Sequence, residues 1–185
     1  MITAINPATG ETVSTHDQMD NAEVRGIVRA VDKAHSTWRK TSFAERGELM
    51  VRAGGLLRER APELARLMAV ELGQALAQGR SAAEKCDSYA EPAERFLADE
   101  PAPTDARTSY VAHRPLGVIL AVMPWNFPLW QVFRFASPAL MAGNTGLLKH
   151  AANVPGCALA IEQVFRDAGF PDDVFRTLMI DNTQV

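Results

Sequence analysis

The chain has few cysteines and no long apolar run. Its 185 residues include only two cysteines, Cys86 and Cys157, which lie far apart and show no CxxC spacing. They predict neither a disulfide framework nor a zinc site, so no metal is expected. The longest apolar run, residues 116–125, is too short to span a bilayer. Residues 1–4 lack the basic and apolar regions of a secretory signal. Together these absences predict a soluble, cytoplasmic protein.

An excess of charge of one sign is also missing. Lys and Arg number 19, Asp and Glu number 22, and the formal net charge is −3. A mildly acidic chain without a basic stripe argues against nucleic acid as the main partner. Hydrophobic residues make up 47% of the chain, which is enough for one domain with a sizeable core.

The first half of the chain carries mainly helical signals. Residues 6–11 place a proline and a glycine for a tight turn between short extended segments. Residues 20–23 and 42–45 each have the form of a capping box, in which an acidic or hydroxyl side chain begins a helix. Helical periodicity then continues to residue 97, and a polar, proline-rich connector follows at residues 99–105.

The second half changes to an α/β pattern. Apolar runs at residues 118–122, 145–149 and 174–180 predict strands, with helices at 129–141 and 155–168 between them. The first run is continuous, which favours a strand buried on both faces. Short connections in the order strand–helix–strand–helix–strand indicate a right-handed parallel unit, so the predicted fold class is α/β.

Ligands of open parallel sheets bind where the strands end, which points here to residues 123–128 and 149–152. There is no GxGxxG motif, so a dinucleotide would have to be held in another way. Asn126 has amide donors that suit an oxyanion, and the alternative is that it caps the following helix. Lys149 is either a group that binds phosphate or ribose, or a solvated strand end.

Two further polar residues have a functional and a structural interpretation. His150 either adds a positive or donor group beside Lys149 or has a purely structural role. Arg134 follows Asn126 by eight residues, about two helical turns, so both lie on about the same face. An arginine there suits a substrate carboxylate, and an ion pair at the surface or with another domain is the alternative.

Several motifs resemble the aldehyde dehydrogenase superfamily. In chain order they are NPATGE at 6–11, ELGQ at 71–74, RPLGVI at 114–119, MPWNFP at 123–128, PAL at 138–140, GNT at 143–145, LK at 148–149 and AGFP at 168–171. The motifs stand in the family's order and span essentially the whole chain. MPWNFP followed by GNT and LK at this spacing is the most specific of these features.

The resemblance implies a truncated aldehyde dehydrogenase fold with an N-terminal helical segment and part of a Rossmann-like sheet. Residues 1–108 would form the helical part of the cofactor-binding domain. Residues 109–117 would be a strand towards an oligomerisation element, so a homo-oligomer is expected when the protein is complete. Residues 118–185 would be the first βαβαβ unit, with the catalytic domain absent.

The family reaction oxidises an aldehyde to a carboxylic acid with NAD or NADP. By resemblance, Asn126 would stabilise the oxyanion that forms when a cysteine thiolate attacks the aldehyde. The resemblance also implies a cofactor-binding set formed by Pro124, Trp125, Asn126, Lys149, His150, Ala151 and Ala152.

The loop after Lys149 points to a branch of the family. The sequence LKHA at 148–151 departs from the commoner Lys-Pro-Ser form and is similar to bacterial succinate-semialdehyde dehydrogenases. Ala152 stands where the family has an acidic residue that holds the adenosine ribose and favours NAD. The absence of this acidic side chain implies that NADP is tolerated or preferred. Arg134 stands where semialdehyde enzymes grip the substrate carboxylate.

In the family, the nucleophile and the glutamate base lie beyond the matched region, and neither cysteine here matches the nucleophile. A helix N-terminus could lower the pKa of Cys157, but buried packing is the favoured interpretation. Three strands of a larger sheet would also expose an apolar edge. The chain is therefore expected to be an N-terminal fragment that is inactive alone. The alternative is a non-catalytic remnant that binds a nucleotide weakly or interacts with another subunit.

Overall fold

The computed structural model describes residues 1–73 and 78–185. Gln74, the last residue of the ELGQ motif, lies outside the described residues. The elements are β1 (Ile2–Ile5), β2 (Thr12–His16), α1 (Asn21–Trp38), α2 (Phe43–Glu59), α3 (Ala61–Leu72), α4 (Gln78–Ala90), α5 (Ala93–Phe96), β3 (Glu100–Pro101), β4 (Tyr110–Val111), β5 (Val118–Met123), α6 (Pro128–Met141), β6 (Thr145–His150), α7 (Pro155–Asp167) and β7 (Phe175–Thr177).

Both predicted capping boxes are confirmed. Asp20 accepts hydrogen bonds from the backbone N–H groups of Ala22 and Glu23 at 2.7 and 2.8 Å, and Glu23 accepts from the Asp20 N–H at 2.8 Å. Ser42 and Glu45 make the same reciprocal pair at the start of α2. Each box satisfies N–H groups that a helix cannot pair internally, which fixes where α1 and α2 begin.

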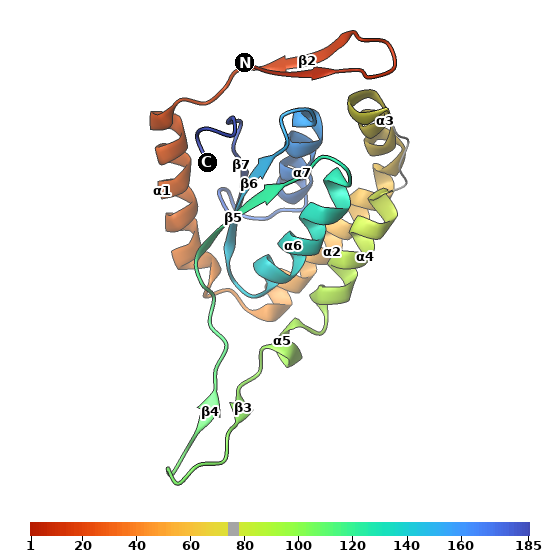
Figure 1. The fold of residues 1–185 in the computed structure, drawn as a ribbon. Coiled ribbons are helices and arrows are strands. Elements are labelled where there is room, and N and C mark those ends of the chain that lie inside the picture. The colour runs from red at the N-terminus through yellow and green to blue at the C-terminus, as the bar shows by residue number, and fades with distance from the viewer. Residues whose placement is uncertain (74–77) are drawn as a thin grey trace.

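The α/β unit is a three-stranded parallel sheet in the order β5-β6-β7. Helix α1 lies on one side of it, and α6 and α7 lie on the other with α2 and α4 beyond them (Figure 1). Successive residues of β6 point to opposite faces. Leu147 therefore packs with Val31 of α1, while Leu148 belongs to the main core with Phe133 and Phe165.

The prediction that the first strand is buried on both faces is wrong. Every residue of the central strand β6 is buried, whereas Leu120 and Val122 of β5 are 45% and 55% exposed. Val118, Leu120 and Val122 share a face because side chains alternate along a strand. Only Val118 packs against the cluster beneath α1, so the end of this edge strand is left uncovered.

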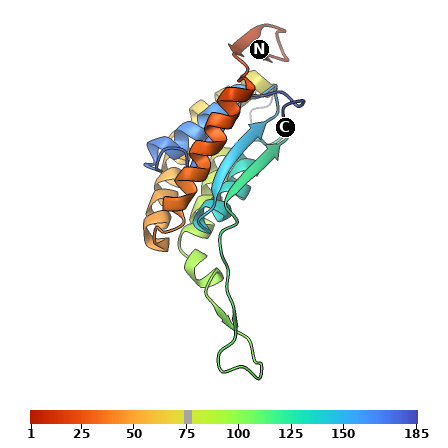
Figure 2. The ribbon, with the colours of Figure 1, turned by 90° about the vertical axis from the view of Figure 1, so that its left-hand side faces the viewer.

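Two antiparallel hairpins extend from the helices and the parallel sheet (Figures 1 and 2). The first joins β1 and β2 through the predicted turn, where the Gly10 N–H donates to the Asn6 carbonyl at 2.7 Å. The second pairs β3 with β4, Glu100 opposite Val111. The connector predicted at residues 99–105 therefore contains a short strand, and Pro101 is tolerated because this strand is an edge.

The third strand is shorter than predicted, since β7 ends at Thr177 although residues up to Ile180 are buried.

Along residues 1–73 and 78–185, no helix is both long enough and apolar enough to cross a membrane.

Candidate functional site

Two of the predicted site segments meet at one edge of the sheet. Met123 pairs with His150 across β5 and β6, so the loops after these parallel strands leave the sheet side by side. The buried His150 ring joins them, because its Nε2 lies 3.1 Å from the Pro128 carbonyl and its Nδ1 accepts the Ala151 N–H at 2.9 Å. Burial lowers the pKa of His150, which favours a neutral ring that donates from Nε2. Both ring nitrogens are thus used within the chain.

Asn126 lies in the exposed loop after β5. Its Oδ1 accepts from Gln131 Nε2 at 3.2 Å, and its Nδ2 group makes no hydrogen bond within the described residues. Helix α6 begins after its N-cap residue Phe127, and no side chain at this N-cap position hydrogen-bonds to the first turn. The helix-capping alternative for Asn126 is therefore wrong, and its amide N–H groups are available to an incoming oxygen.

Gln78 of α4 takes the place of a local cap on α6. Its buried Oε1 accepts from the backbone N–H groups of Leu129 and Trp130 at 3.2 and 3.3 Å. This contact fixes the start of the helix that follows the Asn126 loop. The sequence analysis missed Gln78, because the contact joins residues 51 positions apart. The only local signal is that Phe127 cannot cap a helix.

Glu71 of α3 does the same for α7. Its two carboxylate oxygens accept from the Gly156 and Cys157 N–H groups at 2.7 and 3.0 Å. Val154, at the N-cap position, supplies no side-chain hydrogen bond. A carboxylate at this end also complements the helix dipole. A Cβ on Gly156 would stand 2.7 Å from Glu71 Oε1, so a glycine is needed for this approach.

Both cysteines are buried in the core. Burial raises the pKa of Cys157, and the neighbouring Glu71 carboxylate raises it further. Burial likewise raises the pKa of Cys86 to about 12. Neither thiol forms a thiolate near neutral pH, so the packing interpretation of Cys157 is confirmed and a pKa lowered by the helix N-terminus is wrong.

Lys149 is buried near the carboxyl end of β6, beside Val122 of β5. Its ammonium group donates to Asn182 Oδ1, a neutral partner that the sequence analysis missed. The alternative of a solvated strand end is therefore wrong. A buried cation without a carboxylate partner within the described residues favours an incoming negative or hydroxyl group. Ala151 and Ala152 follow Lys149, and Ala152 is exposed.

Arg134 is exposed on α6, with its guanidinium 5.1 Å from the centre of the Trp130 ring. A shallow pocket of about 350 Å³ lies there, lined by Met123, Trp130, Gln131, Arg134 and Phe135. Gln131 also donates a hydrogen bond to Asn126 Oδ1, so helix α6 connects the Asn126 loop with Arg134. Within the described residues Arg134 makes no ion pair, which leaves it free for a ligand carboxylate.

A family model of the aldehyde dehydrogenase family matches residues 1–185, the full chain. The chain belongs to the aldehyde dehydrogenase family. The resemblance drawn from its motifs is thereby confirmed.

Relatives of this aldehyde dehydrogenase chain include succinate-semialdehyde enzymes. It is 52% identical over 183 residues to a probable NADP(+) succinate-semialdehyde dehydrogenase of Synechocystis, covering 97% of this chain and 40% of that protein. It is 48% identical to NADP(+) succinate-semialdehyde dehydrogenase 1 of Mycobacterium tuberculosis, covering 100% and 42%. The chain thus spans about two-fifths of the length of these relatives.

Solved structures agree with the fold. The succinic semialdehyde dehydrogenase of Streptococcus pyogenes in complex with NADP+ superimposes with a TM-score of 0.95 at 30% identity, covering 100% of this chain and 42% of that one. Gox0499, studied for its cofactor and substrate selection, gives 0.95 at 38% identity with the same coverage. The predicted α/β fold, as part of the aldehyde dehydrogenase fold, is confirmed.

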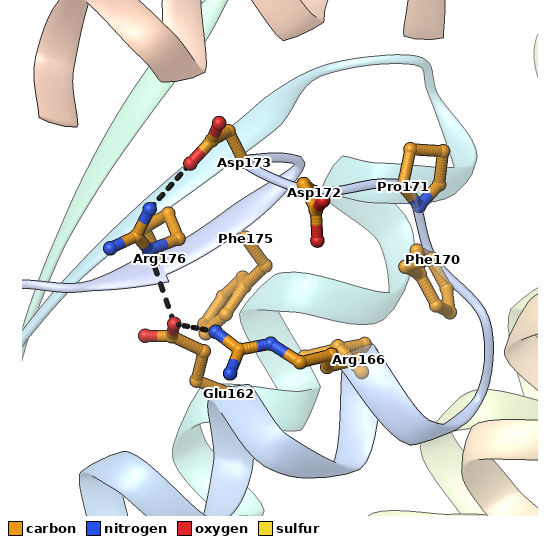
Figure 3. Close-up of a pocket in the computed structure, with 9 residues that line it drawn as sticks. Glu162, Arg166, Phe170, Pro171, Asp172, Asp173, Phe175 and Arg176 are labelled. Atoms are coloured by element: carbon orange, nitrogen blue, oxygen red, sulfur yellow. Dashed lines mark hydrogen bonds and ion pairs between the residues drawn. The ribbon is translucent and has the colours of Figure 1, made fainter.

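Another pocket of this aldehyde dehydrogenase chain, about 250 Å³, lies between the end of α7 and the start of β7 (Figure 3). Its arginines are paired with acids: Glu162 contacts Arg166 at 2.8 Å and Arg176 at 3.1 Å, and Asp173 contacts Arg176 at 2.5 Å. Because both arginines are neutralised and Asp172 also lines the pocket, it offers no free cation for an anionic ligand. It also lies away from the strand ends where the predicted site residues gather.

Proposed function

We propose that this chain supplies the N-terminal cofactor-binding part of an NAD(P)-dependent aldehyde dehydrogenase that oxidises succinate semialdehyde to succinate. The observation that carries the proposal is the pairing of Met123 with His150, which brings the Asn126 loop and the Lys149 loop to one sheet edge. The names and identities of the Synechocystis and Mycobacterium relatives support the substrate.

The residues at this edge fit a dinucleotide. Lys149 presents a buried ammonium whose partner is neutral, which suits a phosphate or ribose oxygen. Ala151 and Ala152, which follow Lys149, carry only methyl side chains and so occupy little of the space beside it. Ala152 carries no carboxylate to repel a 2′-phosphate, so we propose NADP as the preferred cofactor over NAD. Bound here, the dinucleotide would supply the hydride acceptor for the oxidation.

The exposed loop residues Pro124, Trp125 and Asn126 form the facing side of this proposed cofactor site. The Asn126 amide would donate to the oxygen of the attacked aldehyde, where negative charge develops. His150 would contribute by joining the two loops through its neutral ring.

Arg134 would bind the free carboxylate of the substrate. Its guanidinium faces a pocket that contains the Trp130 ring, so the four-carbon chain of a semialdehyde would meet an apolar surface beside a cation.

Both cysteines are buried in the core and their thiols have raised pKa values, so neither is suited to act as the nucleophile. We therefore propose that the thiolate and the base belong to the part of the family's length that this chain does not match. The chain by itself would bind cofactor without turnover.

A direct experiment mixes the purified chain with NADP and succinate semialdehyde, follows reduced nicotinamide by absorbance, and measures NADP binding by tryptophan fluorescence. We expect saturable binding and no turnover. Lys149→Met should weaken binding at least tenfold, whereas Lys33→Met, an exposed change on α1, should have no effect. Turnover by the chain would contradict the assignment of the nucleophile. Equal affinities in the two variants would contradict the role of Lys149.

We also propose a homo-oligomer in the cytoplasm. The β3–β4 hairpin projects from the rest of the structure with Tyr110 and Val111 half exposed, which suits contact with a second subunit (Figure 1). Two free, unpaired cysteines are typical of a reducing compartment.

A further inference from the structure

A further pocket, with several basic residues in its lining, lies at the opposite edge of the sheet from the Asn126 and Lys149 loops. It occupies about 270 Å³ between the first turn of α2 and the segment that leads into β5. Within the described part of the chain its lining contains no acidic residue. The polar residues that face it include Arg39, Ser42, Arg46, His113 and Arg114.

Arg46 is the unusual member of this lining. Its side chain is only 4% exposed, yet no acidic side chain or carbonyl within the described residues accepts a hydrogen bond from it, and its buried Nε has no partner. Its guanidinium lies 4.6 Å from the centre of the Phe43 ring. The adjacent Glu45 carboxylate is occupied by the N–H and hydroxyl groups of Ser42. Burial lowers the pKa of Arg46, and the charge of the adjacent Glu45 carboxylate opposes this shift only in part.

Two acids contact the other basic residues of this lining, His113 and Arg114, and neither contacts Arg39 or Arg46. Asp99 lies 3.6 Å from Arg114, and Glu100 lies 3.5 Å from His113, both at the exposed base of the β3–β4 hairpin. Arg39 makes no ion pair within residues 1–73 and 78–185. Two guanidinium groups, those of Arg39 and Arg46, therefore face the pocket without an ion pair among the described residues. The pocket in Figure 3 is the opposite case, since its arginines contact Glu162 and Asp173.

The backbone around Arg46 makes room for its guanidinium. Gly143 adopts a φ of +86°, and a Cβ at this position would stand 3.1 Å from Arg46 Nη1. A larger residue would be strained and would press on the guanidinium. The glycine thus lets the charged group lie against the chain at the wall of the pocket.

We propose that this pocket is a binding site for a small oxyanion, a phosphate or carboxylate group, held by the guanidinium groups of Arg46 and Arg39. A guanidinium offers planar, paired N–H donors that match two oxygens of such a group. A buried cation without an ion-pair partner is unfavourable, so an anion that enters this pocket would be stabilised by Arg46. The site is separate from the proposed cofactor site, because Pro115 and Gly143 precede strands β5 and β6.

The test is a calorimetric titration of the chain with inorganic phosphate, with chloride keeping the ionic strength constant. We expect saturable binding and a rise in the thermal unfolding midpoint. Arg46→Met should weaken the affinity at least tenfold and remove the rise in midpoint. Arg29→Gln, an exposed arginine on α1, should behave as the unchanged chain does. Equal affinities in all three proteins, or no saturable binding, would overturn the proposal.

Two controls keep the result interpretable. If Arg46→Met does not fold, Arg39→Gln at the exposed rim should still weaken phosphate binding about threefold, and an unchanged affinity would count against the site. Lys149→Met removes the ammonium proposed to bind cofactor phosphate, so saturable phosphate binding that persists in this variant belongs to the Arg46 pocket. Complete loss of phosphate binding in Lys149→Met, with Arg46→Met unaffected, would assign the anion to the cofactor site and overturn the proposal. A parallel titration with acetate shows whether the pocket prefers a carboxylate or a phosphate, and either preference supports the proposal.

Discussion

Ala152 is an exposed methyl group at the position where the family resemblance expects an acidic side chain. Ala152→Glu should weaken NADP binding about tenfold relative to NAD, the effect of roughly 1.4 kcal/mol of repulsion between the carboxylate and the 2′-phosphate. Fluorescence titration of both cofactors gives the ratio. Ala106→Glu, in the exposed hairpin, adds the same charge elsewhere and should leave it unchanged. A ratio that stays constant in Ala152→Glu would refute this role.

Arg134 carries the proposed recognition of a carboxylate. In an enzyme completed with the remaining length of a family member, Arg134→Ala should raise KM for succinate semialdehyde at least tenfold. KM for an uncharged aldehyde of similar length should change little, because only the stacking on Trp130 is lost. Steady-state kinetics with both substrates make the comparison. A similar loss for both aldehydes would sink the assignment.

At the scale of elements, helices α6 and α7 begin where the two site loops end, and both are capped from a distance. Glu71 and Gln78 reach across from α3 and α4 to N–H groups that have no local side-chain partner. The helical layer therefore sets the positions of the loops as well as contributing to the core.

Glu71→Ala should lower the free energy of unfolding by about 2 kcal/mol, because two N–H groups at the α7 N-terminus lose their acceptor. Glu71→Gln keeps one amide oxygen and should cost about half as much. Chemical denaturation measures both variants. Glu63→Ala, an exposed acid in the first turn of α3, is the control and should cost less than either. If Glu71→Ala is no worse than Glu63→Ala, the capping role is wrong.

At the scale of the whole molecule, strand β5 leaves an apolar edge of the sheet open. Leu120 and Val122 are about half exposed, and the strand has no neighbour on its outer side within the described residues. Such edges promote self-association. The change Leu120→Thr with Val122→Lys should reduce aggregation measured by light scattering.

The thermal unfolding midpoint of this double variant should stay nearly constant, because neither side chain is buried. The paired change Leu147→Thr with Leu148→Lys in the central strand should instead prevent folding. Unchanged scattering in the β5 variant would show that this edge does not drive association.

The sequence by itself determined the family, the two capping boxes and the order of strands and helices in the α/β unit. These features depend on residues that are neighbours in the chain or on periodicity, and both are visible in a linear pattern. It also predicted that the residues after β5 and β6 lie together, because parallel strands that pair must end at the same edge.

Only the tertiary structure decided the rest. The burial of Lys149 against Asn182, the caps from Glu71 and Gln78, and the exposed face of β5 depend on residues far apart in the sequence or on where α1 lies over the sheet. The unpaired charge of Arg46 likewise follows from packing, since an arginine in the first turn of a helix is ordinarily solvated. Burial changes the energy of a charged or polar group, and burial is fixed only once the elements pack together.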